Sequence, residues 1–200
     1  MIAAAAALAA AGAPTDRIDI RVPTQPALSP DGRRLAFEWN GDLWLAASTG
    51  GEARILAPHP APDFFPAFSP DGTEIAFLSQ RDDTTQIYVV PVEGGVPEQL
   101  TWHTEGFKSV QWFPDGHRLL ARAVRDASGL DDDRLYVIDR RERHAERMLF
   151  DAYAGEAAIA PDGHRILFTR EGIDPYRVGY RGSAASQIWL FDDRTGAFRQ

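Results

Sequence analysis

Serine and histidine side chains are the residues that could give this chain hydrolytic or metal chemistry. Serine catalysis needs a base held beside the hydroxyl, and the chain has no G-x-S-x-G turn. Ser29 and Ser69 each precede a Pro-Asp-Gly sequence, so they are predicted to be turn residues. The five histidines show no H-x-H or H-x-x-x-H spacing, and there are no cysteines. The sequence therefore predicts no catalytic residue, no metal and no cofactor in these 200 residues.

One segment, residues 171–183, concentrates side chains that are typical of recognition surfaces. Arginine and tyrosine both offer apolar area together with a polar head, and this segment has two of each in an otherwise acidic chain. Two interpretations stand: the segment contacts a peptide or a partner domain, or its tyrosines pack on the structure beneath while its arginines are solvated. The candidate contact residues are Tyr176, Arg177, Tyr180 and Arg181.

A Pro-Asp-Gly repeat organises the whole chain. Its four copies begin at Pro30, Pro70, Pro114 and Pro161, with spacings of 40, 44 and 47 residues. Proline presets φ, aspartate bonds nearby backbone amides and glycine takes a positive φ, which together encode a tight hairpin turn. The repeat therefore predicts a hairpin at the same place in each copy.

Each copy also predicts four short strands. The second copy shows the pattern best: residues 67–69 lead into the turn, and residues 74–78, 86–90 and 98–101 follow as alternating or apolar runs. The third strand carries an aromatic residue in every copy, which predicts packing between neighbouring copies. These aromatics are Trp44, Tyr88, Tyr136 and Trp189.

Small four-stranded sheets cannot bury both of their faces alone, so the copies are expected to stack around an axis as the blades of an all-β propeller. Four blades are visible, and residues 196–200 place the end of the chain within the fourth. We expect a part of a larger ring, six-bladed by analogy with the family named below. The expected domain is residues 16–200, with blades at approximately 18–56, 57–101, 102–150 and 151–200.

The length differences between copies fall in one class of loop. From the turn aspartate to the third strand the separations are 12, 16, 20 and 26 residues, measured from Asp31 to Leu43, Asp71 to Ile87, Asp115 to Leu135 and Asp162 to Ile188. Loops of this class lie on one face of a propeller. In repeat proteins that is commonly the binding face.

The charge of the chain excludes some classes of binding partner, and its N-terminal residues indicate the cellular compartment. A net charge of -8 and a pI near 5.1 argue against nucleic acid or an anionic membrane surface as a partner. Residues 1–13 form an alanine-rich apolar run that is too short to cross a bilayer. The run ends in small residues, so residues 1–15 are predicted to be a signal peptide of an exported, periplasmic protein without membrane insertion.

The repeat resembles the propellers of the TolB and tricorn type. The shared pattern is Ser-Pro-Asp-Gly, an apolar strand, Ile-Tyr-Val-Val and Glu-Gly-Gly, and it covers about residues 20–200. Residues 179–190, Gly-Tyr-Arg-Gly leading into Gln-Ile-Trp-Leu, look like the fourth blade of tricorn-like serine peptidases. The resemblance implies a six-bladed N-terminal propeller followed by further modules, with the catalytic serine and histidine in a C-terminal core that these residues do not contain.

Two functions follow from the resemblance. The first is a propeller that guides or filters peptides for an exported tricorn-like peptidase, and the second is a non-enzymatic TolB-like platform that binds proteins of the cell envelope. The family implies a basic pair on the connection into the third blade that holds the substrate carboxylate. Here residues 101–108 lack an arginine pair, and Lys108 is the candidate in its place. Expected partners are peptides, unfolded polypeptide or downstream domains, and an oligomer is an open alternative.

Overall fold

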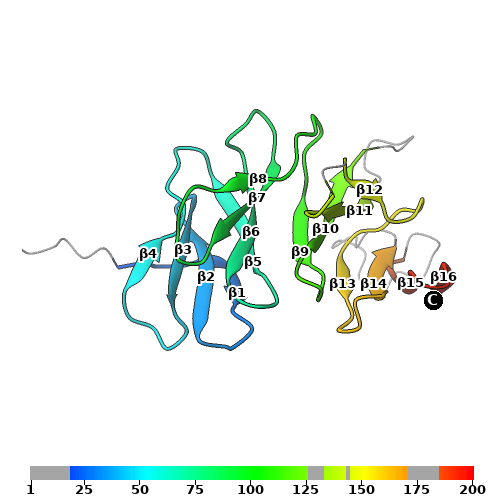
Figure 1. The fold of residues 1–200 in the computed structure, drawn as a ribbon, viewed down its shortest axis with the longest axis horizontal. Helices are drawn as coiled ribbons and strands as arrows, with labels where there is room; N and C mark the ends of the chain where they lie inside the picture. Colours follow the sequence, from blue (N-terminus) through cyan, green and yellow to red (C-terminus); the bar gives the residue numbers. More distant parts are fainter. Residues whose placement is uncertain (1–18, 126–132, 143–144, 171–184) are drawn as a thin grey trace, which may run out of the picture.

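The computed structural model describes residues 19–125, 133–142, 145–170 and 185–200, and in these residues every regular element is a β-strand. Sixteen strands form four antiparallel sheets of four, each built from strands that are consecutive in the chain (Figure 1). The prediction of an all-β propeller with four blades is thereby confirmed. The chain ends just after β16, the short fourth strand of the last sheet.

The four blades follow the four repeats. Figure 1 shows them in sequence along the longest axis, from the blue sheet to the red one. The strands of blades 1 and 2 are β1 (Thr24–Leu28), β2 (Arg34–Trp39), β3 (Asp42–Ala47), β4 (Ala53–Ile55), β5 (Asp63–Phe68), β6 (Glu74–Ser79), β7 (Gln86–Pro91) and β8 (Glu98–Gln99). Those of blades 3 and 4 are β9 (Ser109–Trp112), β10 (Arg118–Val124), β11 (Asp133–Asp139), β12 (Arg147–Met148), β13 (Ala157–Ile159), β14 (Arg165–Arg170), β15 (Gln187–Asp192) and β16 (Ala197–Arg199).

The Pro-Asp-Gly turns join the first and second strands of each blade, and all four lie on the lower side in Figure 1. Their glycines have φ of 71°, 72°, 74° and 70°, a conformation that residues with a Cβ rarely adopt. A Cβ on Gly72 would lie 3.5 Å from Cδ of Pro30, and one on Gly163 would lie 3.5 Å from Cδ of Pro114. Turns of adjacent blades therefore touch in these two pairs.

The core consists of three clusters, one between each pair of neighbouring blades. Alternation along a strand sends one set of side chains to the preceding blade and the other set to the following blade. In blade 2, Phe77 and Val90 pack against blade 1, while Leu78 and Val89 pack against blade 3. A third cluster, which includes Phe168, joins blades 3 and 4. Each blade is thus held by its neighbours.

The first strands of blades 1 and 2 share an irregularity that blades 3 and 4 lack. β1 and β5 each contain a β-bulge, at Gln25 and Phe65, where φ is 52° and 54°. The side-chain oxygen of Gln25 accepts a hydrogen bond of 2.6 Å from the backbone N–H of Phe65. The two bulges are therefore linked directly, and they tie β1 to β5.

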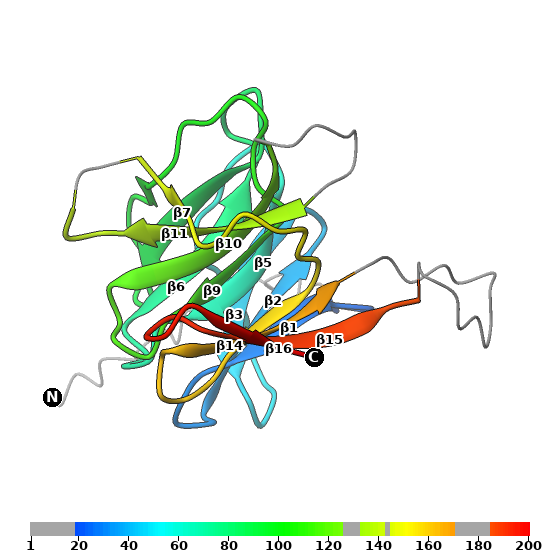
Figure 2. The ribbon, with the colours of Figure 1, turned by 90° about the vertical axis from the view of Figure 1, so that its right-hand side faces the viewer.

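The view in Figure 2 looks along the row of blades from the fourth, with β14, β15 and β16 in front and the earlier sheets behind them. The strands of blade 4 cross those of the more distant blades at a large inclination. The fan of sheets is that of a propeller segment.

Candidate functional site

The five residues that the sequence singled out divide into two groups. Tyr176, Arg177, Tyr180 and Arg181 lie outside the described residues. Lys108 is described, and it directly precedes β9, the first strand of blade 3.

Lys108 belongs to a cluster of four charged side chains between blades 3 and 4. Its Nζ lies 2.9 Å from Oδ1 of Asp133, whose Oδ2 lies 3.5 Å from Nη1 of Arg122. The same Nη1 of Arg122 lies 2.7 Å from Oε1 of Glu156. The two cations and two carboxylates sum to zero formal charge, so the cluster can hold strand ends in place and offers no net attraction to an anionic group.

A second cluster lies where β6 of blade 2 ends. Arg81 donates to Asp63 through Nη2 at 2.6 Å and to the carbonyl of Ala57 at 2.9 Å; Asp63 is buried, and the side chain of Arg81 is 12% exposed. The guanidinium carbon of Arg81 is 5.5 Å from the ring centres of Phe77 and Tyr88. Burial raises the pKa of Asp63, although Arg81 acts in the opposite direction. The cluster ties residue 57, at the end of blade 1, to the second blade.

The hydroxyl of Tyr88 completes this cluster towards the solvent. It donates a hydrogen bond of 3.2 Å to Oδ2 of Asp82. Burial, followed by the negative charge of Asp82, raises the pKa of Tyr88 to about 12. Tyr88 therefore stays protonated and acts as a hydrogen-bond donor in the physiological pH range.

Gln86 fixes the connection from blade 2 into blade 3. This buried amide donates to the carbonyl of His103 at 2.6 Å and accepts from the hydroxyl of Thr101 at 2.8 Å. Thr101 in turn accepts from the backbone N–H of Ile87 at 2.9 Å. Residues 101–103 are consequently anchored on both sides of Trp102, because a buried polar network of this kind has few alternative arrangements.

Arg125 repeats in blade 3 the arrangement of Arg81 in blade 2. Its guanidinium carbon lies 3.8 Å from the ring centre of Tyr136, and it bonds to the carboxylate of Glu146. Burial acts to raise the pKa of Glu146, but the hydrogen bond and the positive charge of Arg125, together with a backbone hydrogen bond, lower it overall. Arg81 and Arg125 thus hold the third-strand tyrosines of their blades.

The described residues contain no group of three or more potential ligands that could hold a metal ion. Their serines and histidines serve turns instead: the hydroxyls of Ser29 and Ser69 donate to Asp31 and Asp71 at 2.6 Å, and Nδ1 of His164 lies 2.8 Å from Asp193. The same serine hydroxyls accept hydrogen bonds from the backbone N–H groups of Arg34 and Glu74, so they close the turns.

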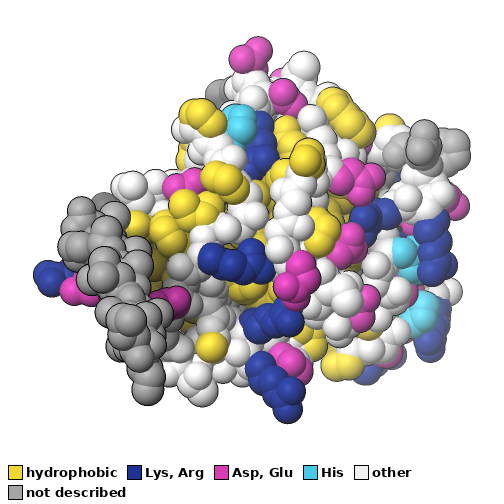
Figure 3. Space-filling view, turned by 60° about the vertical axis from the view of Figure 1, so that its left-hand side comes forward, with side chains coloured by type: hydrophobic (Ala, Val, Ile, Leu, Met, Phe, Trp, Pro, Cys, Tyr) yellow, Lys and Arg dark blue, Asp and Glu magenta, His cyan; other side chains and the backbone are white. Residues whose placement is uncertain are grey.

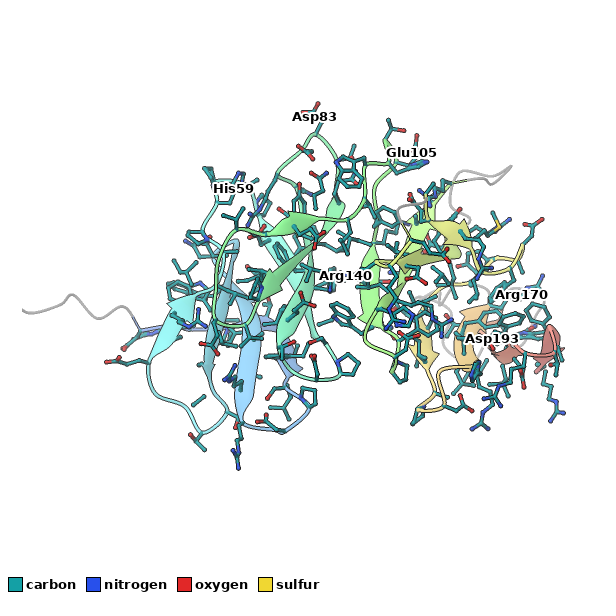
Figure 4. The ribbon with its side chains drawn as sticks, viewed as in Figure 1. His59, Asp83, Glu105, Arg140, Arg170 and Asp193 are labelled. Atoms are coloured by element: carbon teal, nitrogen blue, oxygen red, sulfur yellow. The ribbon has the colours of Figure 1, made fainter. Side chains whose placement is uncertain are left out.

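The surface is mixed in charge. On the face drawn in Figure 3, Lys and Arg side chains lie next to Asp and Glu, and neither sign forms a continuous patch. Figure 4 places His59, Asp83 and Glu105 on separate loops along the upper side, opposite the Pro-Asp-Gly turns. Within the described ranges there is no helix that could span a membrane.

Comparison with known proteins decides the family. Residues 21–200 match the model of the tricorn protease N-terminal β-propeller domain. The chain belongs to this family. Tricorn protease homolog 1 of Streptomyces coelicolor is 30% identical over 194 residues, which covers 88% of this chain and 17% of the relative. The chain thus spans about a sixth of the length of that tricorn relative.

Solved structures place the tricorn-type propeller among related folds. The tricorn protease superposes with a TM-score of 0.66 at 23% identity, over 90% of this chain and 18% of that protein. TolB from Acinetobacter baumannii superposes with a TM-score of 0.67 at 18% identity, over 88% of this chain and 42% of TolB. At these identities the likeness establishes the propeller fold alone.

The buried arginines of this tricorn-type propeller were not among the residues that the sequence singled out. A signal for them exists, because Arg81 and Arg125 each lie ten positions after a turn aspartate, Asp71 and Asp115. Repeat alignment on the turn therefore finds both arginines. What alignment does not supply is the partner: Asp63 lies eighteen residues before Arg81, whereas Glu146 lies twenty-one residues after Arg125.

Proposed function

We propose that this chain is the substrate-handling propeller of an exported tricorn-like serine peptidase and that it guides or filters peptides without cleaving them. The observation that carries the proposal is the family match over residues 21–200, together with a tricorn protease homolog of which the chain spans 17%. The peptidase serine and histidine then belong to a part of the protein outside these residues. Two further blades would complete a six-bladed ring.

The face opposite the Pro-Asp-Gly turns is the proposed peptide-contact face. The two neutral clusters around Lys108 and Arg81 support this assignment, because they fix the strand ends on which the longer loops are mounted. With Lys108 paired to Asp133, the proposed contacts with a peptide backbone or carboxylate fall to Arg177 and Arg181, and Tyr176 and Tyr180 would provide apolar area.

A second function is a TolB-like platform that binds envelope proteins and belongs to no enzyme. The superposition on TolB, with a TM-score of 0.67, favours it. The two functions differ in the sequence encoded downstream of codon 200: a peptidase core supports the first, and a stop after two further blades supports the second. Export through residues 1–15 is common to both, and N-terminal sequencing of the mature protein from a periplasmic fraction tests it.

The decisive experiment compares the 200-residue chain with the full-length gene product on a panel of chromogenic peptides. The chain alone is expected to cleave none of them. In the full-length protein, Arg177→Ala with Arg181→Ala is expected to lower kcat/KM about tenfold, because each interface arginine typically contributes about 1 to 3 kcal/mol.

The matched control is Arg33→Ala with Arg194→Ala, two exposed arginines close to the turns of the opposite face. Turnover in this control variant should equal that of the unaltered protein. Cleavage by the purified 200-residue chain would contradict the proposal, and so would equal turnover in both double variants.

A further inference from the structure

A groove of about 670 Å³ lies on the outer rim of the propeller, where the last strand of blade 2 meets the outer strands of blade 3. Figure 4 labels Arg140, which lies in the groove between these two blades. The volume is within the range of sites that hold one or two amino-acid side chains or a small ligand. Its lining comprises Glu98, Gln99, Leu100, Trp102, His103, Ile138, Asp139, Arg140, Glu142, Ala145 and Glu146.

The floor of the groove is rigid. Arg140 bonds to Glu74 through Nη1 at 2.5 Å and through Nη2 at 3.2 Å, and the same Nη2 bonds to Glu98 at 3.1 Å. Its guanidinium carbon is 5.6 Å from the ring centre of Trp112. Arg140 is therefore fully engaged with blade 2, and it holds the carboxylate of Glu98 in place at the rim.

Trp102 is the feature of the rim that the fold does not explain. All five tryptophans of the chain are described, and Trp102 is the only exposed one among them, with 73% of its surface accessible to solvent. It is not a loose side chain at a loop tip, since the Gln86 network anchors Thr101 and His103 on either side of it. An indole presented by an anchored backbone is a prepared binding surface.

The charge of the lining indicates the class of ligand. The lining contains four carboxylates, those of Glu98, Asp139, Glu142 and Glu146, and one arginine. Glu98 is bonded to Arg140, and Glu146 is bonded to Arg125 behind the lining, so the negative charge offered to a ligand is that of Asp139 and Glu142. Arg140 directs Nη1 and Nη2 at the carboxylates of Glu74 and Glu98, which compensate its positive charge and compete with an incoming anion. A cation that enters the groove meets carboxylates and the face of an indole, which are the two partners that bind guanidinium groups best.

We propose that this groove binds an arginine-bearing segment of a partner polypeptide, with the guanidinium stacked on Trp102 and paired with the carboxylates of the rim. Arginine fits better than lysine because its planar, weakly hydrated cation stacks on an aromatic face while its edge donates hydrogen bonds. The groove lies on the outer rim, and Lys108 is not among its lining residues. The inference is independent of peptidase function.

The test measures fluorescence anisotropy of a labelled peptide, acetyl-Gly-Arg-Gly-Arg-Gly-amide, on titration with the 200-residue chain at low salt. The same peptide with citrulline in place of arginine keeps the shape and removes the charge. We expect the citrulline peptide and the Trp102→Ala variant each to bind about tenfold more weakly, because each removes one of the two partners. Glu142→Gln is expected to weaken binding about threefold.

Two exposed residues near the groove, which do not line it, provide matched controls. Val96→Ala removes apolar surface just before β8, and Glu105→Gln removes a negative charge from the next loop. Both should bind the arginine peptide as the unaltered chain does. The proposal is overturned if the citrulline peptide binds equally well, if Trp102→Ala binds no more weakly than Val96→Ala, or if Glu105→Gln has the same effect as Glu142→Gln.

Discussion

Blades 2 and 4 show the same repeat in two different settings. Ile87 of blade 2 and Ile188 of blade 4 occupy the same position of the third strand, yet the first is fully buried and the second is 67% exposed. Ala76 and Leu167, the equivalent pair of the second strand, are 0% and 48% exposed. Strand pairing and turn are the same in both blades, whereas burial of this face depends on a following blade. The repeat therefore encodes its own sheet, and the neighbour provides the core.

The two blades also close the same turn with different hydrogen bonds. In blade 2 the hydroxyl of Ser69 accepts from the backbone N–H of Glu74 at 3.0 Å and donates to Asp71. Blade 4 has Ala160 in place of the serine, and the corresponding N–H, that of Arg165, turns to Oδ1 of Asp162 at 3.1 Å. Nε of Arg165 adds a bond of 2.6 Å to the other oxygen of Asp162. Two different sets of side-chain hydrogen bonds thus stabilise the same turn conformation.

The largest expected change in stability comes from shortening the third-strand isoleucine, whose burial differs most between blades 2 and 4. Ile87→Ala should lower the free energy of unfolding by about 3 kcal/mol, because it leaves a cavity in the packed cluster between blades 2 and 3. Ile188→Ala should change it by less than about 0.5 kcal/mol, since most of that side chain already faces solvent. Urea unfolding followed by tryptophan fluorescence measures both. Equal losses would show that blade 4 is covered in solution by another copy of the chain.

An intermediate effect is expected from exchanging the turn residues. Ser69→Ala should cost about 1 kcal/mol, because the part-buried N–H of Glu74 loses its acceptor. The reverse change in blade 4, Ala160→Ser, should alter stability by less than about 0.5 kcal/mol, since Asp162 already bonds the N–H of Arg165. The same unfolding experiment applies. A gain of about 1 kcal/mol from Ala160→Ser would mean that the two turns are not equivalent solutions.

The smallest expected effect is on the stability of the fold at low pH. The hydroxyl of Ser69 and then the backbone N–H of Thr73 lower the pKa of Asp71, and the backbone amides of His164 and Arg165 lower that of Asp162 well below its ordinary value. A lowered folded-state pKa contributes stability that is complete above the unfolded pKa, near about 4, and is lost as the pH falls towards the folded one.

The variant Asp71→Asn with Asp162→Asn should accordingly show a shallower fall in Tm between about pH 4 and pH 2 than the unaltered chain. Circular dichroism melts across this range measure the slope. Asp83→Asn, at an exposed loop position on the opposite face, is the control and should leave the slope unchanged. An unaltered slope in the double variant would show that the turn aspartates do not contribute to acid sensitivity.

The fold was predictable from the sequence because its information is local and repeated. Each Pro-Asp-Gly turn fixes one hairpin, and the period fixes the number of blades that the chain contains. The bulges at Gln25 and Phe65 were not predicted, although each residue precedes a proline, because a positive φ at a non-glycine residue has no firm signature in the sequence. Such a conformation is stabilised by long-range contacts, here the bond between Gln25 and Phe65.

The candidate site was less predictable, since its partners are distant in sequence. Lys108 was singled out as a cation on the connection into blade 3, but its pairing with Asp133, 25 residues later, has no signal in the sequence. The groove beside Trp102 combines residues from two blades, and no pattern within one repeat predicts it. The arginines and tyrosines of residues 176–181 lie outside the described residues, and their role stays a prediction.

The contact between the proline of one turn and the glycine of the next bears on how a propeller of this kind gains blades during evolution. Pro30 meets Gly72 and Pro114 meets Gly163, so two of the three seams between described turns use the same pair of residues, whereas a Cβ on Gly116 at the third seam would meet nothing within 4 Å. A tandem duplication of the coding segment for one repeat would therefore produce a neighbour that already fits at this point. A propeller of this kind can therefore gain a blade by duplication of a repeat first, and the new blade can diverge in sequence afterwards.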